Sequence, residues 1–232
     1  MAGCVGYATS LKSRPMPHPP PIDTGILELL ASKICHDLIS PIGAVCNGVE
    51  FLEDMGAEAG EEVTGLIAYS AQQASAKLQA YRMAYGAGGA DDTIKPEDVH
   101  KTLQAMIAPD NKIKQDWDPY GNLGYEDRPK AFSKMLLCAL LLGMECLPKG
   151  GTLNVTAGSQ TGETCVTARG PDANIRGQTE KALSLTLHRD VLEPKYIHPY
   201  VTGLLAHTYG YKISLRDSKD NSVIITVAHP SA

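Results

Sequence analysis

The sequence lacks the features that mark membrane proteins and nucleic-acid-binding proteins. Its longest apolar run, Met135 to Met144, is about half of the roughly 20 residues needed to cross a bilayer. The N-terminal part has no hydrophobic core typical of a signal peptide. The net charge of -5 leaves no basic excess that would attract a phosphate backbone. We therefore expect a cytoplasmic protein that binds neither membranes nor nucleic acids.

Cysteine pairs with metal-binding or redox spacing are also missing. None of the six cysteines belongs to a CxxC motif, and most have apolar neighbours, which is typical of small buried side chains in a reducing cytosol. The cysteines are Cys4, Cys35, Cys46, Cys138, Cys146 and Cys165. Three histidines of the C-terminal half, His188, His198 and His207, lack convincing partners for a metal site. The sequence therefore predicts no metal centre.

The first third of the chain contains two long stripes of apolar residues at helical spacing. Residues 1–21 end in a proline cluster and are predicted to form a flexible tail. Residues 22–88 are predicted to fold as a hairpin of two long helices, with Asp23 or Thr24 as the first cap and a break at Gly56 to Gly60. The stripes are Leu27, Leu30, Ile34, Leu38, Pro41, Val45, Val49 and Leu52 on the first helix, and Val63, Ile67, Ala71, Ala74, Leu78, Tyr81 and Tyr85 on the second.

An isolated hairpin cannot bury two such stripes, because each helix has only one neighbour. Pairing with a second copy would cover them both. The pattern therefore predicts a homodimer whose hairpins form a four-helix bundle across a two-fold axis.

The rest of the chain, residues 93–232, alternates irregularly between helical and strand patterns. This alternation favours an α+β sandwich with helices on one face of a mixed sheet. Helices are expected at 96–106, 129–147, 179–188 and 199–209, and strands at 152–157, 164–168, 212–216 and 222–228.

His36 has an unusual place on the first predicted helix. At about 100° per residue it lies roughly 200° from both Ile34 and Leu38, so it points away from the apolar stripe. Pro41 removes the helical hydrogen bond to the carbonyl of Asp37 and costs about 3 kcal/mol relative to alanine. An exposed histidine beside such a proline indicates a functional site, although an ordinary solvated histidine fits the helix position as well.

The local sequence favours the functional interpretation. The segment His36-Asp37-Leu38-Ile39-Ser40-Pro41-Ile42 resembles the phosphoacceptor box of sensor histidine kinases. Residues 135–153 resemble the helix, turn and strand that open the ATP-binding domain of those kinases. Two asparagines four residues apart normally serve magnesium and phosphates there, whereas this chain has Cys138 and Leu142, which offer no oxygen ligand. The adenine-binding DxGxG motif and a glycine-rich lid are missing as well.

A kinase-like fold without nucleotide chemistry resembles the ChpT-type histidine phosphotransferases of alphaproteobacteria, over about residues 22–232. The resemblance implies a dimeric four-helix bundle followed by a degenerate histidine-kinase ATPase-like α/β sandwich. It also implies an enzyme of a cell-cycle phosphorelay, which takes phosphoryl groups from the receiver domain of a hybrid histidine kinase (CckA-like). The acceptors would be response regulators (CtrA-like and CpdR-like). The chain would need no cofactor of its own, because the partner receiver brings the Mg²⁺.

The site residues are assigned from the resemblance and from the helix face that carries His36. His36 is the predicted nucleophile, and Asp37 is predicted to orient its ring or to hold the proton of its other nitrogen, by resemblance to the acid after the kinase histidine. The predicted partner-binding residues surround His36 on the first helix and are Ser32, Lys33, Ile39, Ser40, Gly43 and Asn47. Two alternatives stay open, an active ATP-dependent histidine kinase and a non-catalytic dimeric scaffold that binds receivers.

Overall fold

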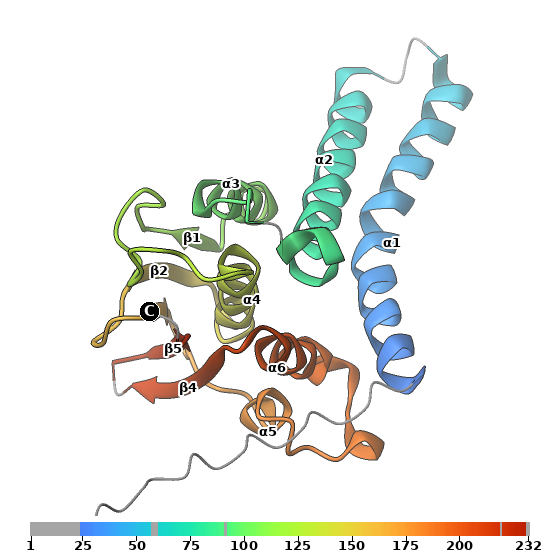
Figure 1. The fold of residues 1–232 in the computed structure, drawn as a ribbon. Coiled ribbons are helices and arrows are strands. Elements are labelled where there is room, and N and C mark those ends of the chain that lie inside the picture. The colour runs from blue at the N-terminus through green and yellow to red at the C-terminus, as the bar shows by residue number, and fades with distance from the viewer. Residues whose placement is uncertain (1–23, 57–59, 91, 219, 231–232) are drawn as a thin grey trace, which may run out of the picture.

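The computed structural model describes residues 24–56, 60–90, 92–218 and 220–230. A long helical hairpin stands beside a layered α/β domain (Figure 1). The hairpin consists of α1 (Thr24–Met55) and α2 (Gly60–Tyr85), and the short 3-10 helix η2 (Ala87–Ala90) follows it. The predicted tail at 1–21, the cap candidate Asp23 and the middle of the predicted break lie outside the described residues.

The α/β domain contains a mixed five-stranded sheet in the order β1-β2-β3-β5-β4. Strands β1 and β2 are parallel, and the other neighbours are antiparallel. The helices lie on one face of this sheet (Figure 1), as the sequence predicted. The elements are α3 (Pro96–Ile107), β1 (Ile113–Gln115), α4 (Phe132–Glu145), β2 (Gly151–Ala157), β3 (Glu163–Arg169), α5 (Thr179–Leu183), η3 (Arg189–Val191), η4 (Pro194–Tyr196), α6 (Ile197–Tyr209), β4 (Lys212–Ser218) and β5 (Ser222–Ala228).

The core of the domain is organised around α4. Every residue of this helix from Phe132 to Gly143 is buried, which is typical of a helix that is apolar on all sides. On the sheet side it meets β3 and β5, where alternate residues such as Val166, Ile225 and Val227 point inward. This central helix therefore holds the sheet to the remaining helices.

The hairpin is fixed to the domain at its base. Ala80 and Ala84 of α2 are fully buried, and Ile26 at the start of α1 belongs to the same apolar cluster as Ile197 of α6. The ammonium of Lys134 in α4 donates to the carbonyl of Gly86 at 2.7 Å, just beyond the end of α2. A cation at this position satisfies a free carbonyl and complements the helix dipole. The two parts of the chain are thus joined by both apolar and polar contacts.

The structure differs from two predictions about local structure and adds one strand that was not predicted. The helix expected at 179–188 ends at Leu183, because Leu185 has a positive φ of 58° that no α-helix accommodates. Strand β1 was not predicted, since its three residues carry no alternating pattern long enough to detect. Cys35 and Cys46 are exposed on α1, whereas Cys138 and Cys146 are buried as expected. The exposed pair lies on the flank of α1 that α2 does not cover.

Helix α1 is the one described helix whose length and composition would allow it to cross a membrane. Uninterrupted apolar runs predict no such segment. The mean hydropathy of a helix is a more permissive criterion, because it tolerates polar residues between the apolar ones. Length and composition alone are weak grounds, because one side of α1 packs on α2 and another carries His36 and Asp37.

Candidate functional site

Helix α1 presents His36 to solvent. The side chain is 89% exposed, in agreement with its predicted angular position on the helix. A side of the helix about 120° away from His36 faces α2, where Gly48 is buried against Ile67. Because the helix is long and continuous around it, His36 stands on a rigid element rather than on a loop.

Asp37 lies beside His36 and is held by several donors. One carboxylate oxygen, Oδ1, is 3.2 Å from Nδ1 of His36. The other, Oδ2, accepts a short hydrogen bond from the hydroxyl of Tyr81 on α2 and lies 3.5 Å from the ammonium of Lys33. Burial by itself would raise the pKa of Asp37, but the Tyr81 hydrogen bond and the Lys33 charge outweigh it and bring the pKa below its ordinary value. Asp37 is therefore a carboxylate at neutral pH.

The ionised state of Asp37 determines the tautomer of His36. A carboxylate can only accept a hydrogen bond, so Nδ1 of His36 must carry the proton in their contact. The other ring nitrogen, Nε2, then has a free lone pair. In this tautomer the site presents Nε2, the nucleophilic nitrogen, to a partner.

The backbone next to this pair is also satisfied from α2. Pro41 lacks an N–H, so the carbonyl of Asp37 does not receive the usual helical hydrogen bond from position 41. The ammonium of Lys77 donates to that carbonyl at 3.1 Å. The proline thus leaves an acceptor that the neighbouring helix uses.

The predicted partner-binding residues fall into two groups. Ser32, Ile39, Ser40 and Asn47 are exposed, with 69% of Ile39 accessible, and a Cβ added at Gly43 would meet nothing within 4 Å. These residues form an open surface around His36. Lys33 is different, because its ammonium lies between Asp37 and Glu145 of α4, at 3.5 Å and 4.0 Å. It is therefore partly engaged within the chain.

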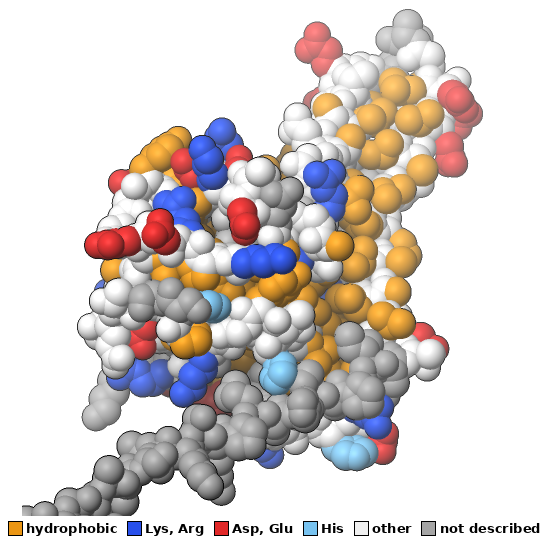
Figure 2. Space-filling view, in the orientation of Figure 1, with side chains coloured by type: hydrophobic (Ala, Val, Ile, Leu, Met, Phe, Trp, Pro, Cys, Tyr) orange, Lys and Arg blue, Asp and Glu red, His pale blue; other side chains and the backbone are white. Residues whose placement is uncertain are grey.

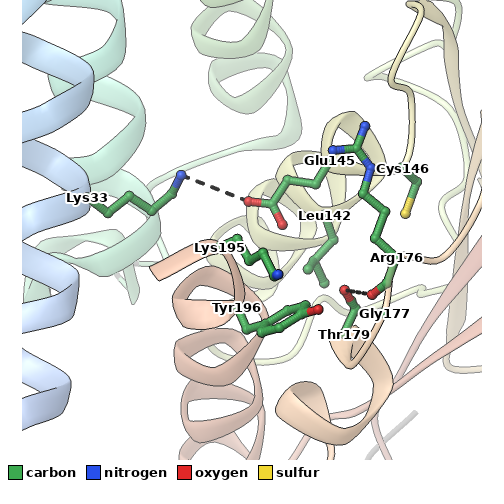
Figure 3. A pocket seen from close by; sticks show the side chains of 9 residues that line it. All are labelled: Lys33, Leu142, Glu145, Cys146, Arg176, Gly177, Thr179, Lys195 and Tyr196. Atoms are coloured by element: carbon green, nitrogen blue, oxygen red, sulfur yellow. Dashed lines mark hydrogen bonds and ion pairs between the residues drawn. The ribbon is translucent and has the colours of Figure 1, made fainter. Parts of the chain in front are cut away.

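A cavity of about 480 Å³ opens where Lys33 faces the end of α4 (Figure 3). Its lining includes Leu142, Glu145, Arg176 and Lys195, and the Lys33 side chain reaches toward Glu145 in this view. Burial raises the pKa of Glu145 to about 7, although the charges of Lys33 and Arg176 act to lower it.

The positions that serve magnesium and nucleotide phosphates in the kinases do not offer suitable ligands here. Leu142 brings an alkyl side chain to the cavity, and Cys138 is fully buried in the domain core. Hard cations prefer oxygen ligands, so neither residue fits a magnesium–nucleotide complex. In the described part of the chain, no group of three or more His, Cys, Asp or Glu side chains could hold a metal ion.

Comparison with known proteins shows the family to which the chain belongs. The profile described as histidine phosphotransferase C-terminal domain matches residues 96–221. The protein phosphotransferase ChpT of Brucella abortus (strain 2308) is 34% identical over 197 residues, which cover 84% of this chain and 91% of the relative. The chain belongs to the ChpT-type histidine phosphotransferases. A bacterial phosphotransferase structure at 1.7 Å has a TM-score of 0.70 and 30% identity, covering 90% of this chain and 98% of that one.

Membership in the ChpT-type family confirms the predicted enzyme class, a protein histidine phosphotransferase. It also confirms the predicted order of a helical region followed by an α/β region with a mixed sheet.

Two residues at the site of this ChpT-type chain were missed by sequence reasoning. Tyr81 was assigned only to the apolar stripe, and Lys77 was not considered. Pro41 indicates that a donor such as Lys77 is needed, because the carbonyl of Asp37 loses its helical partner and requires a donor from another element. Which residue supplies it depends on the register between two helices, which the sequence does not specify.

Proposed function

We propose that this phosphotransferase relays phosphoryl groups between receiver domains through Nε2 of His36. The observation that carries the proposal is the exposed imidazole whose Nδ1 faces the ionised Asp37. The open surface around His36 supports it, because a receiver must bring its aspartate to within about 3 Å of the reacting nitrogen.

The relay consists of two balanced half-reactions. In the first, the Nε2 lone pair attacks the phosphorus of a receiver's aspartyl phosphate, an N–P bond forms and the aspartate carboxylate leaves. The ring becomes positively charged, and the Asp37 carboxylate beside Nδ1 stabilises that charge. In the second, an aspartate of another receiver attacks the phosphorus, the N–P bond breaks and the neutral imidazole returns. No proton or electron has to be supplied from outside.

The chain contributes no cofactor in this proposal. Charge on the transferred phosphoryl group is neutralised by the Mg²⁺ of the receiver domain, and the chain positions its nucleophile. The donor is the receiver domain of a hybrid histidine kinase (CckA-like), and the acceptors are response regulators (CtrA-like and CpdR-like), in the cytoplasm. This assignment of partners and location follows from the family resemblance.

A homodimer is part of the proposal. Hydrophobic side chains gather along the visible side of the hairpin (Figure 2), and those of Leu27, Ile42, Val49 and Leu78 are between 42% and 57% exposed. Exposed apolar surface of this kind marks an interaction site. A second hairpin would cover it and complete a four-helix bundle.

The decisive experiment incubates the purified chain with a radiolabelled phospho-receiver. We expect label on the chain that is acid-labile and base-stable, as a phosphohistidine is, and that moves on to a second receiver. The His36→Ala variant should take up no label. Labelling of His36 by ATP without any donor would instead indicate a kinase, and receiver binding without any labelled intermediate would indicate a scaffold.

A further inference from the structure

Two residues of α2 donate hydrogen bonds to Asp37. Lys77 and Tyr81 are one helical turn apart, so they point from the same face of α2 toward α1. The ammonium of Lys77 donates to the main-chain carbonyl of Asp37 at 3.1 Å, and the hydroxyl of Tyr81 donates to Oδ2. Asp37 is thus fixed at both its backbone and its side chain by residues 40 and 44 positions away.

The Tyr81 contact leaves Asp37 with one oxygen for the histidine. Because Oδ2 accepts from Tyr81, the carboxylate plane is oriented and Oδ1 is turned toward Nδ1 of His36. Tyr81 is itself only 6% exposed, so its hydroxyl has little freedom to move elsewhere. Burial and the Asp37 carboxylate both raise the pKa of Tyr81, and the hydroxyl keeps the proton that it donates.

The Lys77 contact compensates for the proline. Without it, the carbonyl freed by Pro41 would lack its helical partner next to the reacting residue, and the turn that carries Asp37 would be less constrained. A charged donor is well suited to this position, since a hydrogen bond from an ammonium is stronger than one from a neutral group.

We propose that Tyr81 and Lys77 are positioning residues that act through Asp37 to hold His36 with the proton on Nδ1 and the lone pair on Nε2. The inference rests on the proposed function of His36. An imidazole released from Asp37 exchanges between its two tautomers in water, and the tautomer with the proton on Nε2 has no lone pair on that nitrogen with which to attack phosphorus. Loss of either contact therefore reduces the reactive fraction without removing the docking surface.

The test compares Tyr81→Phe with Tyr85→Phe. Both changes remove one tyrosine hydroxyl from neighbouring turns of α2, but the hydroxyl of Tyr85 pairs with His198 and does not contact Asp37. For each variant we would measure the single-turnover transfer rate at saturating phospho-receiver, the receiver Kd and the melting temperature. The ¹⁵N chemical shifts of the His36 ring report its tautomer directly and require no receiver.

We expect Tyr81→Phe to slow transfer about tenfold, as expected for the loss of a hydrogen bond to a charged group. Receiver Kd should be unchanged, and the His36 ring should shift away from the Nδ1–H tautomer. Tyr85→Phe should transfer at the wild-type rate with a wild-type ring spectrum. Lys77→Met provides a second variant, for which we expect the same slower transfer and the same change in the ring spectrum. Lys77→Arg should behave as wild type does, because a guanidinium can also donate to the carbonyl.

A wild-type ring spectrum in Tyr81→Phe and Lys77→Met, or equal slowing in Tyr81→Phe and Tyr85→Phe, would overturn the proposal. Failure of the proposed function has a different signature. In that case His36→Ala would still transfer phosphate, while the ring spectra of the α2 variants could still respond as described.

Discussion

The hydroxyl of Tyr85 donates to Nδ1 of His198 across 2.7 Å and so connects the end of α2 to α6. The other ring nitrogen, Nε2, lies 3.1 Å from the carbonyl of Cys138 in α4. A carbonyl can only accept, so Nε2 carries the proton and Nδ1 accepts from the tyrosine. His198 is therefore a neutral, fully satisfied histidine at the junction of three helices, which accounts for its burial without any metal.

This junction makes stability sensitive to acid. Burial lowers the pKa of His198 from 6.5 to about 3. Below pH 6.5 the unfolded chain binds a proton that the folded chain does not, so stability falls as the pH decreases toward 3. The slope contributed by His198 reaches about 1.4 kcal/mol per pH unit. We expect His198→Gln, in which this titration is absent, to be less sensitive to acid than wild type in urea denaturation between pH 6 and 4.

Protonation of Glu145 should have the opposite effect on stability over much of the same pH range. Its pKa is raised from 4.5 to about 7, so the folded chain binds the proton first and stability increases as the pH falls through 7 toward 4.5. Glu145→Gln should therefore be more sensitive to acid than wild type. Equal pH dependence in wild type and His198→Gln would contradict the assignment of His198.

The contact between the two hairpin helices depends on Gly48. A Cβ added there would lie 2.5 Å from Cγ1 of Ile67, too close for two carbon atoms. We expect Gly48→Ala to lower the free energy of unfolding by about 1–2 kcal/mol, because overpacking outweighs the higher helix propensity of alanine. Gly43→Ala is the matched control, since its Cβ meets nothing within 4 Å. It should keep or slightly raise the melting temperature at the same protein concentration, and a stabilised Gly48→Ala would show that the helices are packed less closely.

The sequence predicted those elements whose signals are local. Strand β5 was predicted with its observed bounds, because Val223, Ile225 and Val227 place apolar side chains at every second position. The start of α3 at Pro96 was predicted because proline is favoured in the first turn of a helix. Strand β1 could not be predicted in the same way. Its residues are held by parallel pairing to β2, with Ile113 opposite Gly151, and only the tertiary structure creates that pairing.

The site also combines features that depend on local sequence with features that depend on tertiary structure. The exposure of His36 and its proximity to Asp37 follow from helix geometry alone. The contact of Asp37 with Tyr81 spans 44 positions and depends on the relative register of α1 and α2. Apolar stripes are nearly periodic, so they fix which faces meet but leave the register open. Sequence reasoning therefore found the nucleophile and missed the residues that position it.

The homodimer can be tested on one exposed leucine of α2. Leu78 is 55% exposed and Leu66 is 52% exposed, but they lie about 120° apart around the helix. Leu66 is in line with Ala84, on the side that faces the α/β domain, whereas Leu78 continues the uncovered apolar surface. We expect Leu78→Glu to give monomers at micromolar concentration by light scattering, and Leu66→Glu to stay dimeric. A wild-type monomer at this concentration would contradict the four-helix bundle.

The cavity beside α4 should not bind ATP. Leu142 and Cys138 supply no oxygen ligand for magnesium, so the phosphates would lose the cation that neutralises them. Calorimetry with Mg-ATP is expected to give no heat of binding. A micromolar Kd would return the kinase alternative to consideration.

Docking and chemistry can be separated on the surface around His36. Gly43 lies about 20° from His36 around α1, and a Cβ added there meets nothing within 4 Å, so Gly43→Trp places its bulk on this open surface. A receiver that places its aspartate on His36 would collide with the indole, and we expect receiver affinity to fall at least about tenfold. His36→Ala changes the same surface very little, so it should bind receivers with wild-type affinity while transferring nothing. Titration calorimetry and label transfer on both variants separate the two effects. If Gly43→Trp binds receivers as wild type does, the receiver approaches His36 from another side of α1, and the docking surface assigned from the sequence is wrong.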